Sequence, residues 1–137
     1  MFHFKAITAK KTFIDQDVDE VIVPSLKGPL SISTGYTNII EVLQNAGVMK
    51  VISGNSVLFC ALIQGVIRVE NGSCTVIAED INFGNDIDLD RAINAKNKML
   101  ERLKEEQSEY DFKVAKIKLD KAIARIDAKT LSNGGKL

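Results

Sequence analysis

The sequence predicts an N-terminal antiparallel β-sandwich over residues 1–85 and a C-terminal antiparallel two-helix hairpin over residues 86–137. Charge density differs between these two parts: 14 of the first 85 residues are charged, against 22 of the remaining 52. Both prolines and most glycines lie in the first part with many β-branched residues, as strands and turns require. After residue 85, apolar residues recur every three or four positions, which is the period of a helix.

Seven short segments of the first part are predicted as strands, because each is rich in apolar or β-branched residues and lies between turn signals. They are residues 3–8, 18–23, 29–33, 48–53, 57–63, 66–70 and 73–78. Such regular spacing is typical of a sandwich or a barrel.

Turn residues and alternation indicate how some of these strands pair. Gly54-Asn55 and Asn71-Gly72 can adopt the positive φ that a tight hairpin needs, so residues 48–78 are expected to form an antiparallel meander. Leu30 and Ile32 alternate with serines, which predicts a strand at the surface with one buried and one solvated face.

The first helix is expected to begin at Asp86, where three alternating aspartates place negative charge at the positive end of the helix dipole. Its apolar stripe covers residues 89–103. Ser108-Glu109-Tyr110-Asp111 matches a capping pattern, and a second apolar stripe follows over residues 112–126. The short connection predicts that the helices fold back on each other. Two helices alone bury little surface, so the hairpin needs the β domain or a partner, and its position can change.

Composition excludes several classes of protein. Basic and acidic residues number 18 each, so the chain lacks the broad positive field of a nucleic-acid binder. No apolar stretch approaches the roughly 20 residues that cross a bilayer. The N-terminus lacks the pattern of a secretory signal, so structure is expected to start at residue 1 and secretion is not expected. Cys60 and Cys74 lie in candidate strands with no CxxC pair, which favours two reduced core thiols over a disulfide.

The sequence gives no support for catalysis. His3 is the only histidine, lies at an N-terminus that is expected to fray, and is predicted as a surface strand residue. Asp15, Asp17, Asp19 and Glu20 lack the Gly and distal Glu of an EF-hand, so they predict a solvated turn and no metal site. No Gly-rich phosphate loop precedes a helix.

Several local patterns, taken in order along the chain, resemble the epsilon subunit of F-type ATP synthases, which is called delta in mitochondria. The patterns are Val21-Ile22-Val23-Pro24, Gly28-Pro29-Leu30-Ser31-Ile32 with Gly35, Gln64-Gly65-Val66-Ile67-Arg68-Val69 before Cys74-Thr75-Val76-Ile77-Ala78-Glu79, and Asp86-Ile87-Asp88-Leu89-Asp90-Arg91-Ala92. They cover nearly the whole chain.

This resemblance implies a non-catalytic subunit of the central stalk. Such a subunit binds the gamma subunit and the c-ring and rotates with them, and the alpha and beta catalytic subunits are further candidate partners. It would lie peripherally on the cytoplasmic face of an energy-transducing membrane, either a bacterial plasma membrane or a plastid thylakoid. The loop that the family uses against the c-ring corresponds here to Pro29, Leu30, Ser31, Ile32, Gly35 and Tyr36. Within this loop Pro29, Ser31, Thr34 and Tyr36 replace the usual Glu, Gly, Pro and His.

The resemblance also implies a regulatory hairpin. In many bacterial members the hairpin extends along gamma and blocks ATP hydrolysis, and in some it binds ATP. The residues that match the nucleotide motif are Ile87, Asp88, Arg91, Ala92 and Arg125. Lys98 and Lys121 replace Arg and Asn82 replaces Glu, which removes part of the bidentate phosphate geometry, so ATP is expected at most as a weak regulatory ligand. A simpler interpretation needs no ligand: Asp88 caps the helix and Arg91 pairs with a nearby carboxylate.

The second helix carries a basic side that is either a docking face for gamma or a catalytic subunit, or a solvated face interleaved with acids. Its residues are Lys113, Lys116, Lys118, Lys121, Arg125 and Lys129. Met99, Leu100 and Leu103 are expected in the hairpin core rather than in a peptide groove. Two other functions stay open: a free-standing nucleotide-sensing regulatory module, and an adaptor that offers a strand edge to a peptide.

Overall fold

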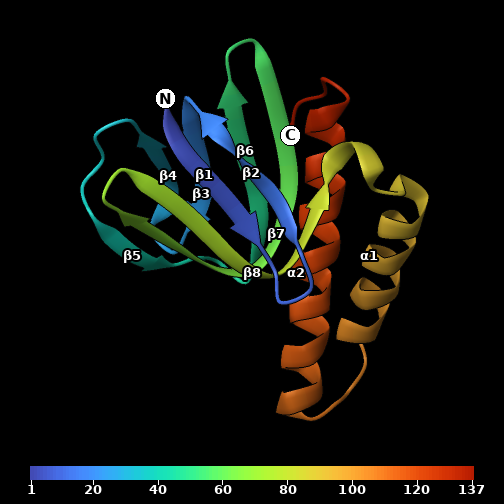
Figure 1. The fold of residues 1–137 in the computed structure, drawn as a ribbon. Coiled ribbons are helices and arrows are strands. Elements are labelled where there is room, and N and C mark those ends of the chain that lie inside the picture. The colour runs from blue at the N-terminus through green and yellow to red at the C-terminus, as the bar shows by residue number, and fades with distance from the viewer.

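A computed structural model describes residues 1–137 as a β domain with two helices along one side (Figure 1). The strands are β1 (Phe2–Ile7), β2 (Thr12–Val18), β3 (Glu20–Ser25), β4 (Gly28–Ser33), β5 (Ile39–Val42), β6 (Ala46–Ser53), β7 (Ser56–Glu70) and β8 (Ser73–Phe83). A one-turn 3-10 helix, η1 (Gly84–Asp86), leads into α1 (Leu89–Leu103) and α2 (Glu109–Ser132). Neither helix is long and apolar enough to cross a membrane.

The strands form one continuous hydrogen-bonded path in the order β2-β1-β8-β7-β6-β3-β4, with β5 paired to β7. The path folds over a core of 19 buried residues that includes Phe4, Met49, Leu62 and Ile67. Pairing is antiparallel throughout, except that β1 and β8 run parallel. The predicted β-sandwich followed by a helical hairpin is therefore confirmed, with one parallel pair that the sequence did not indicate.

β7 joins two segments that were predicted as separate strands. It pairs with β6 through residues 56–63 and with β5 through residues 66–69, while β8 pairs along its other edge. Gln64 adopts a φ of 48° between the two halves. This positive φ bends the chain without ending the strand, which allows one strand to serve two neighbours.

Two strands escaped prediction, and one predicted turn is wrong. Asp15 and Asp17 lie in β2, a sheet edge whose outward side chains face solvent, and not in a turn. Aspartate disfavours strands on average, but here it occupies only the solvated face, where the penalty is small. β5 is a short strand whose residues are mostly exposed, so it shows little alternation.

The predicted turn at Asn71-Gly72, the meander and the surface strand are confirmed. Asn71 and Gly72 both have positive φ, 51° and 79°, in the turn between β7 and β8. β6, β7 and β8 form the antiparallel meander. β4 is the last strand of the path, with Ile32 buried and Ser31 exposed.

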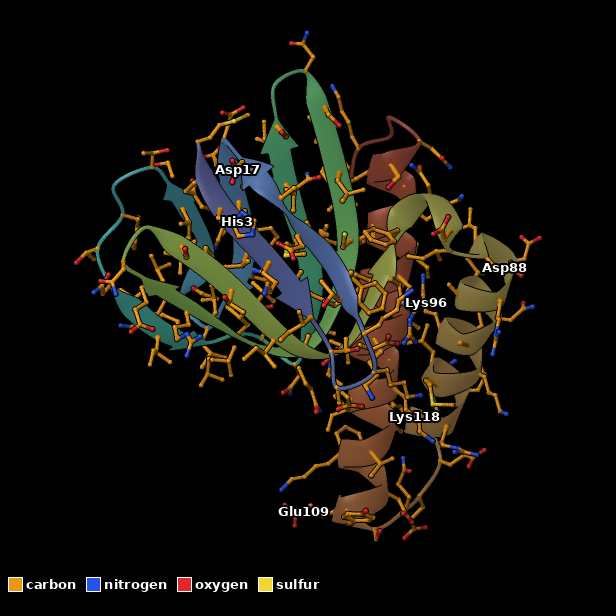
Figure 2. All side chains as sticks on the ribbon, in the orientation of Figure 1. His3, Asp17, Asp88, Lys96, Glu109 and Lys118 are labelled. Atoms are coloured by element: carbon orange, nitrogen blue, oxygen red, sulfur yellow. The ribbon has the colours of Figure 1, made fainter.

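The helix starts are also largely as predicted. Asp88 is the N-cap of α1 and accepts the N–H of Arg91 at 3.1 Å, and Ser108 caps α2 by accepting the N–H of Asp111 at 3.1 Å. Asp86 lies in η1, before the helix, because the chain makes a separate turn there. Figure 2 shows Asp88 and Glu109 at opposite ends of the hairpin. Met99 packs against Ala115 and Leu119 in the hairpin core.

α2 packs directly on the sheet through small residues. Ala124 and Ala128 contact Ala61 of β7. A Cβ on Gly84 would lie 2.5 Å from the carbonyl oxygen of Ala128, so only glycine fits there. We call this set, Ala61, Gly84, Ala124 and Ala128, the small-residue contact. α1 packs chiefly on α2, which makes it the outer helix.

Cys60 and Cys74 are buried free thiols in the core of the β domain. Burial raises the pKa of each thiol to about 12. Both are therefore protonated, unreactive core residues, as the sequence indicated.

Substitution of Gly84 should undock α2. Gly84→Ala forces the new methyl group against the backbone of Ala128, and overpacking of this kind costs about 1–3 kcal/mol. Hydrogen exchange of α2 amides should accelerate relative to the strands. In the control, Gly65→Ala, the added methyl meets its nearest atom at 3.4 Å and should leave α2 protected. Equal protection of α2 in both variants would contradict the proposed close approach.

His3 should titrate above its ordinary pKa of 6.5. Its ring nitrogens contact Asp17 at 3.0 Å and Asp15 at 2.5 Å, and these hydrogen bonds raise the pKa. The extra attraction between β1 and β2 is therefore fully present below the unfolded pKa and is lost as pH rises through the folded pKa. NMR titration of His3 in Asp17→Asn should show a lower pKa than in a Glu41→Gln control. An unchanged pKa in Asp17→Asn would rule out the bond to Asp17 as its cause.

Candidate functional site

A hollow of about 620 Å³ lies where the hairpin meets the β domain. We call it the hinge pocket, because η1 and the start of α1 form one of its walls. The other walls come from the β1–β2 turn, the end of β8 and the middle of α2. Its lining residues are Lys11, Phe13, Asp80, Ile81, Asn82, Phe83, Asp86, Ile87, Asp88, Arg91, Ala92, Ala95, Ala122 and Arg125.

All five residues of the predicted nucleotide motif line this one pocket. Ile87, Asp88, Arg91 and Ala92 come from the start of α1, and Arg125 comes from α2. The fold thus brings together residues that are more than 30 positions apart in the chain. Nucleotide binding by these five residues stays a prediction, but the structure shows that they line a single pocket.

Arg125 joins α2 to the last strand. Its Nε donates to Oδ1 of Asn82 at 2.9 Å, and its Nη2 lies 3.3 Å from Oδ2 of Asp80. The Arg125 side chain is only 33% exposed, which shields this pair partly from water. Asn82 stands where ATP-binding members carry Glu, and here its amide oxygen accepts from the arginine.

The ligand-free interpretation of the motif holds for Asp88 but not for Arg91. Asp88 caps α1 as expected. Arg91, by contrast, takes part in none of the ion pairs of the structure. The expected pairing with a nearby carboxylate is wrong: Asp80 pairs with Arg125, Asp88 accepts the backbone N–H of Arg91, and Asp86, which lines the same pocket, takes part in no ion pair.

Two other basic residues of the predicted nucleotide pattern do not reach the pocket. The Nζ of Lys121 lies 3.7 Å from Oε1 of Glu79 on β8, and the Lys98 side chain is exposed on α1. Neither lines the hollow. Any phosphate contact in this arrangement must therefore come from other cations.

The residues assigned to the c-ring contact form one edge of the β domain, well separated from the hinge pocket in the strand order. Pro29, Leu30, Ser31 and Ile32 lie in β4, and Gly35 and Tyr36 lie in the turn that follows. Pro29, Ser31 and Gly35 are exposed, whereas Ile32 is buried in the core and Tyr36 packs against it. Ile32 therefore supports this edge from inside rather than facing a partner.

The basic side of α2 is interleaved with acids. Lys113 pairs with Glu109 at 3.5 Å, and Lys116 pairs with Asp120 at 3.0 Å. Lys129 donates to the carbonyl oxygen of Asn85 at 3.0 Å. This side of α2 is therefore a solvated face of mixed charge rather than a uniformly positive surface. The C-terminal half of α2 is held to the segment that follows the β domain.

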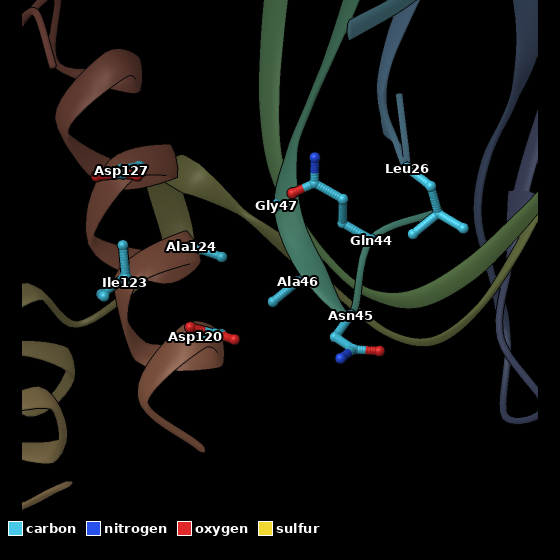
Figure 3. Close-up of a pocket in the computed structure, with 9 residues that line it drawn as sticks. All are labelled: Leu26, Gln44, Asn45, Ala46, Gly47, Asp120, Ile123, Ala124 and Asp127. Carbon is cyan, nitrogen blue, oxygen red and sulfur yellow. The ribbon is translucent and has the colours of Figure 1, made fainter. Parts of the chain in front are cut away.

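A second hollow, of about 500 Å³, lies between α2 and the start of β6 (Figure 3). Asp120, Ile123, Ala124 and Asp127 line it from the helix. The facing wall consists of Leu26, Gln44, Asn45, Ala46 and Gly47. Partial burial raises the pKa of Asp127, and Lys96 of α1 partly offsets this rise. No sequence motif pointed to this hollow.

The sequence did not point to several residues of the hinge pocket, among them Lys11, Phe13 and Asp80. Phe13 lies in β2, a strand that was not predicted, and Lys11 lies in the turn directly before it. Asp80 lies in the last part of β8, beyond the predicted end of that strand. The only sequence signal for this wall of the pocket was the pair of a basic and an aromatic residue, Lys11 and Phe13, on either side of Thr12.

Comparison with known proteins identifies the family of both parts of the chain. Residues 1–84 match the family described as "ATP synthase, Delta/Epsilon chain, beta-sandwich domain", and residues 85–130 match "ATP synthase, Delta/Epsilon chain, long alpha-helix domain". The ATP synthase epsilon chain of Gloeobacter violaceus is 34% identical over 124 residues, which are 90% of this chain and 93% of that relative. The epsilon chain of Desulforamulus reducens is 31% identical over 122 residues, 89% of this chain and 92% of that relative.

Solved structures share the fold. A chain of the Euglena gracilis mitochondrial ATP synthase (OSCP/F1/c-ring) superposes with a TM-score of 0.77 at 14% identity, covering 85% of this chain and 74% of that one. A chain of the Tetrahymena thermophila mitochondrial ATP synthase (central stalk/c-ring) gives a TM-score of 0.66 at 15% identity, covering 93% and 96%. With two domain matches in sequence order and relatives above 30% identity over nearly its whole length, the chain belongs to the ATP synthase delta/epsilon family.

Proposed function

We propose that this chain is a non-catalytic epsilon subunit in the central stalk of an F-type ATP synthase, where it rotates with gamma and the c-ring and couples proton-driven rotation to ATP synthesis. The match of both domains to the family, in order and over nearly the full length, is the observation that carries this proposal. The fold shared with a chain from a central stalk/c-ring structure supports it. Catalysis would belong to other subunits, and the chain would bind the cytoplasmic face of its membrane only through the complex.

The β domain offers two surfaces for such partners. The exposed edge of β4 and its following turn, with Pro29, Ser31 and Gly35, suits the c-ring. An apolar row crosses the outer face of the sheet, where Val42, Val66 and Ile77 pair side by side on β5, β7 and β8. Val42 is 57% exposed and Ile77 48%, so this row suits the gamma subunit.

A pull-down of the tagged chain from native membranes in mild detergent tests the stalk role. Gamma, the alpha and beta subunits and the c-ring should be recovered together. Val42→Asp with Ile77→Asp should reduce recovery of gamma at least about tenfold, because a charge is placed in an apolar interface. Val57→Asp, which alters a residue that is 47% exposed outside the row, is the control.

Two outcomes of the pull-down would count against the proposal. Recovery of the chain alone, or with unrelated proteins, would refute the stalk role and favour a free-standing nucleotide-sensing module. Equal loss of gamma with Val57→Asp would refute only the placement of the gamma surface.

We infer further that the hinge pocket binds ATP as a weak regulatory ligand of the hairpin. The convergence of Ile87, Asp88, Arg91, Ala92 and Arg125 on one hollow supports this inference. The pocket contains groups from η1, α1, α2 and β8, so a ligand there would favour the docked hairpin over one extended along gamma.

Arg91 should contribute most of the binding energy that α1 provides. It has no ion pair to break, and a charge-assisted hydrogen bond contributes about 1.5–3 kcal/mol, so Arg91→Gln should weaken ATP binding about tenfold or more. Calorimetric titration of the isolated chain measures this. Arg102→Gln, at the other end of α1, is the matched control and should bind as the unmodified chain does. Equal affinity of the two variants would exclude Arg91 from the site.

A further inference from the structure

The β1–β2 turn brings a lysine from the β domain into the hinge pocket. The N–H of Thr8 donates to the carbonyl oxygen of Lys11 at 3.0 Å. The hydroxyl oxygen of Thr8 accepts the N–H groups of Lys10 and Lys11 at 3.3 Å and 3.4 Å. These three bonds close a compact turn, so the position of Lys11 is set by its backbone. Lys11 lines the pocket, whereas Lys10 does not.

An aromatic pair holds the Lys11 side chain at the base of the hairpin. The ammonium nitrogen lies 4.5 Å from the centroid of the Phe13 ring. Phe13 in turn packs against Phe83, with 5.8 Å between ring centroids. Phe83 is the last residue of β8, directly before η1. A cation–π contact orients the ammonium without neutralising its charge, so Lys11 remains able to bind an anion.

Charges around the pocket leave two cations without a partner. Among the acidic residues, Asp80 is paired with Arg125, Asp88 accepts the backbone N–H of Arg91, and Asp86 of η1 takes part in no ion pair. Lys11 and Arg91 take part in no ion pair of the structure. They come from different walls of the hollow, one from the β domain and one from α1. Two unpaired cations on separate walls favour a ligand with several negative charges.

We propose that Lys11 is a ligand-binding residue of the hinge pocket, where its ammonium group binds the phosphate groups of a nucleoside polyphosphate together with Arg91. This inference rests on the ATP site proposed above. It replaces the contribution of Lys98 and Lys121, which do not reach the hollow, with a cation from the β domain. The ligand then contacts the β1–β2 turn and α1 at the same time, and so links the outer helix to the β domain.

Binding studies with four forms of the full chain test the role of Lys11: the unmodified chain, Lys11→Met, Lys11→Arg and Lys10→Met. Each is titrated with ATP, ADP and adenosine at low salt, where phosphate contacts are strongest. Lys11→Met should weaken ATP binding about five- to tenfold and leave adenosine binding unchanged. Lys11→Arg should retain affinity for ATP within about twofold. Lys10→Met, one residue away and outside the pocket, should match the unmodified chain.

The outcomes separate this inference from the site on which it rests. No binding of ATP by the unmodified chain overturns the ATP site and the role of Lys11 together. If ATP binds and Arg91→Gln weakens it, but Lys11→Met and Lys10→Met behave alike, only the role of Lys11 is overturned. Equal weakening of ATP and adenosine by Lys11→Met also overturns it, since the lysine would then act through the shape of the wall. The NMR signals of the β domain away from the turn should be unchanged in each variant, which shows that the variants are folded.

Discussion

The close approach of α2 to the sheet is the constraint on which the rest of this structure depends. Ala124 and Ala128 meet Ala61, and Gly84 leaves room for the helix backbone. Small side chains bury little apolar area each, so the contact is tight in geometry but modest in energy. The hairpin is therefore held precisely when docked, and yet its release needs no large part of the core to be exposed.

The polar contacts around this interface orient α2 on the sheet but contribute little to the free energy of docking. Arg125, Lys121 and Lys129 bond to the last residues of β8 and to the segment after it. Each pair is partly solvated, so each contributes little by itself. Because all three act on the same junction, they favour one rotation of α2 on the sheet, the one that its small-residue contact allows. That rotation places Arg125 opposite the start of α1 and so forms the hinge pocket.

Local sequence patterns predicted much of the fold because each of them depends only on neighbouring residues. Asp88 and Ser108 mark their helices through backbone hydrogen bonds that depend on neighbouring residues alone. Asn71-Gly72 likewise fixes a turn. β2 and β5 were missed because they are exposed edge strands whose pairing partners, not their own residues, make them strands. The sequence around Gln64 resembles a strand end for a similar reason: only tertiary pairing with β8 continues the strand past this residue.

The site was predicted only as far as the family motif extended. Residues near the start of α1 could be named from the sequence, but Lys11 could not, since its place in the pocket depends on the parallel pairing of β1 with β8. The same pairing affects how the chain reaches its fold. His3 lies beside Ser73, so the first strand waits unpaired on this side until nearly the whole β domain has been synthesised. Only then can β1 pair with β8. The helical hairpin is synthesised next, so the whole sheet is already available for α2 to dock on.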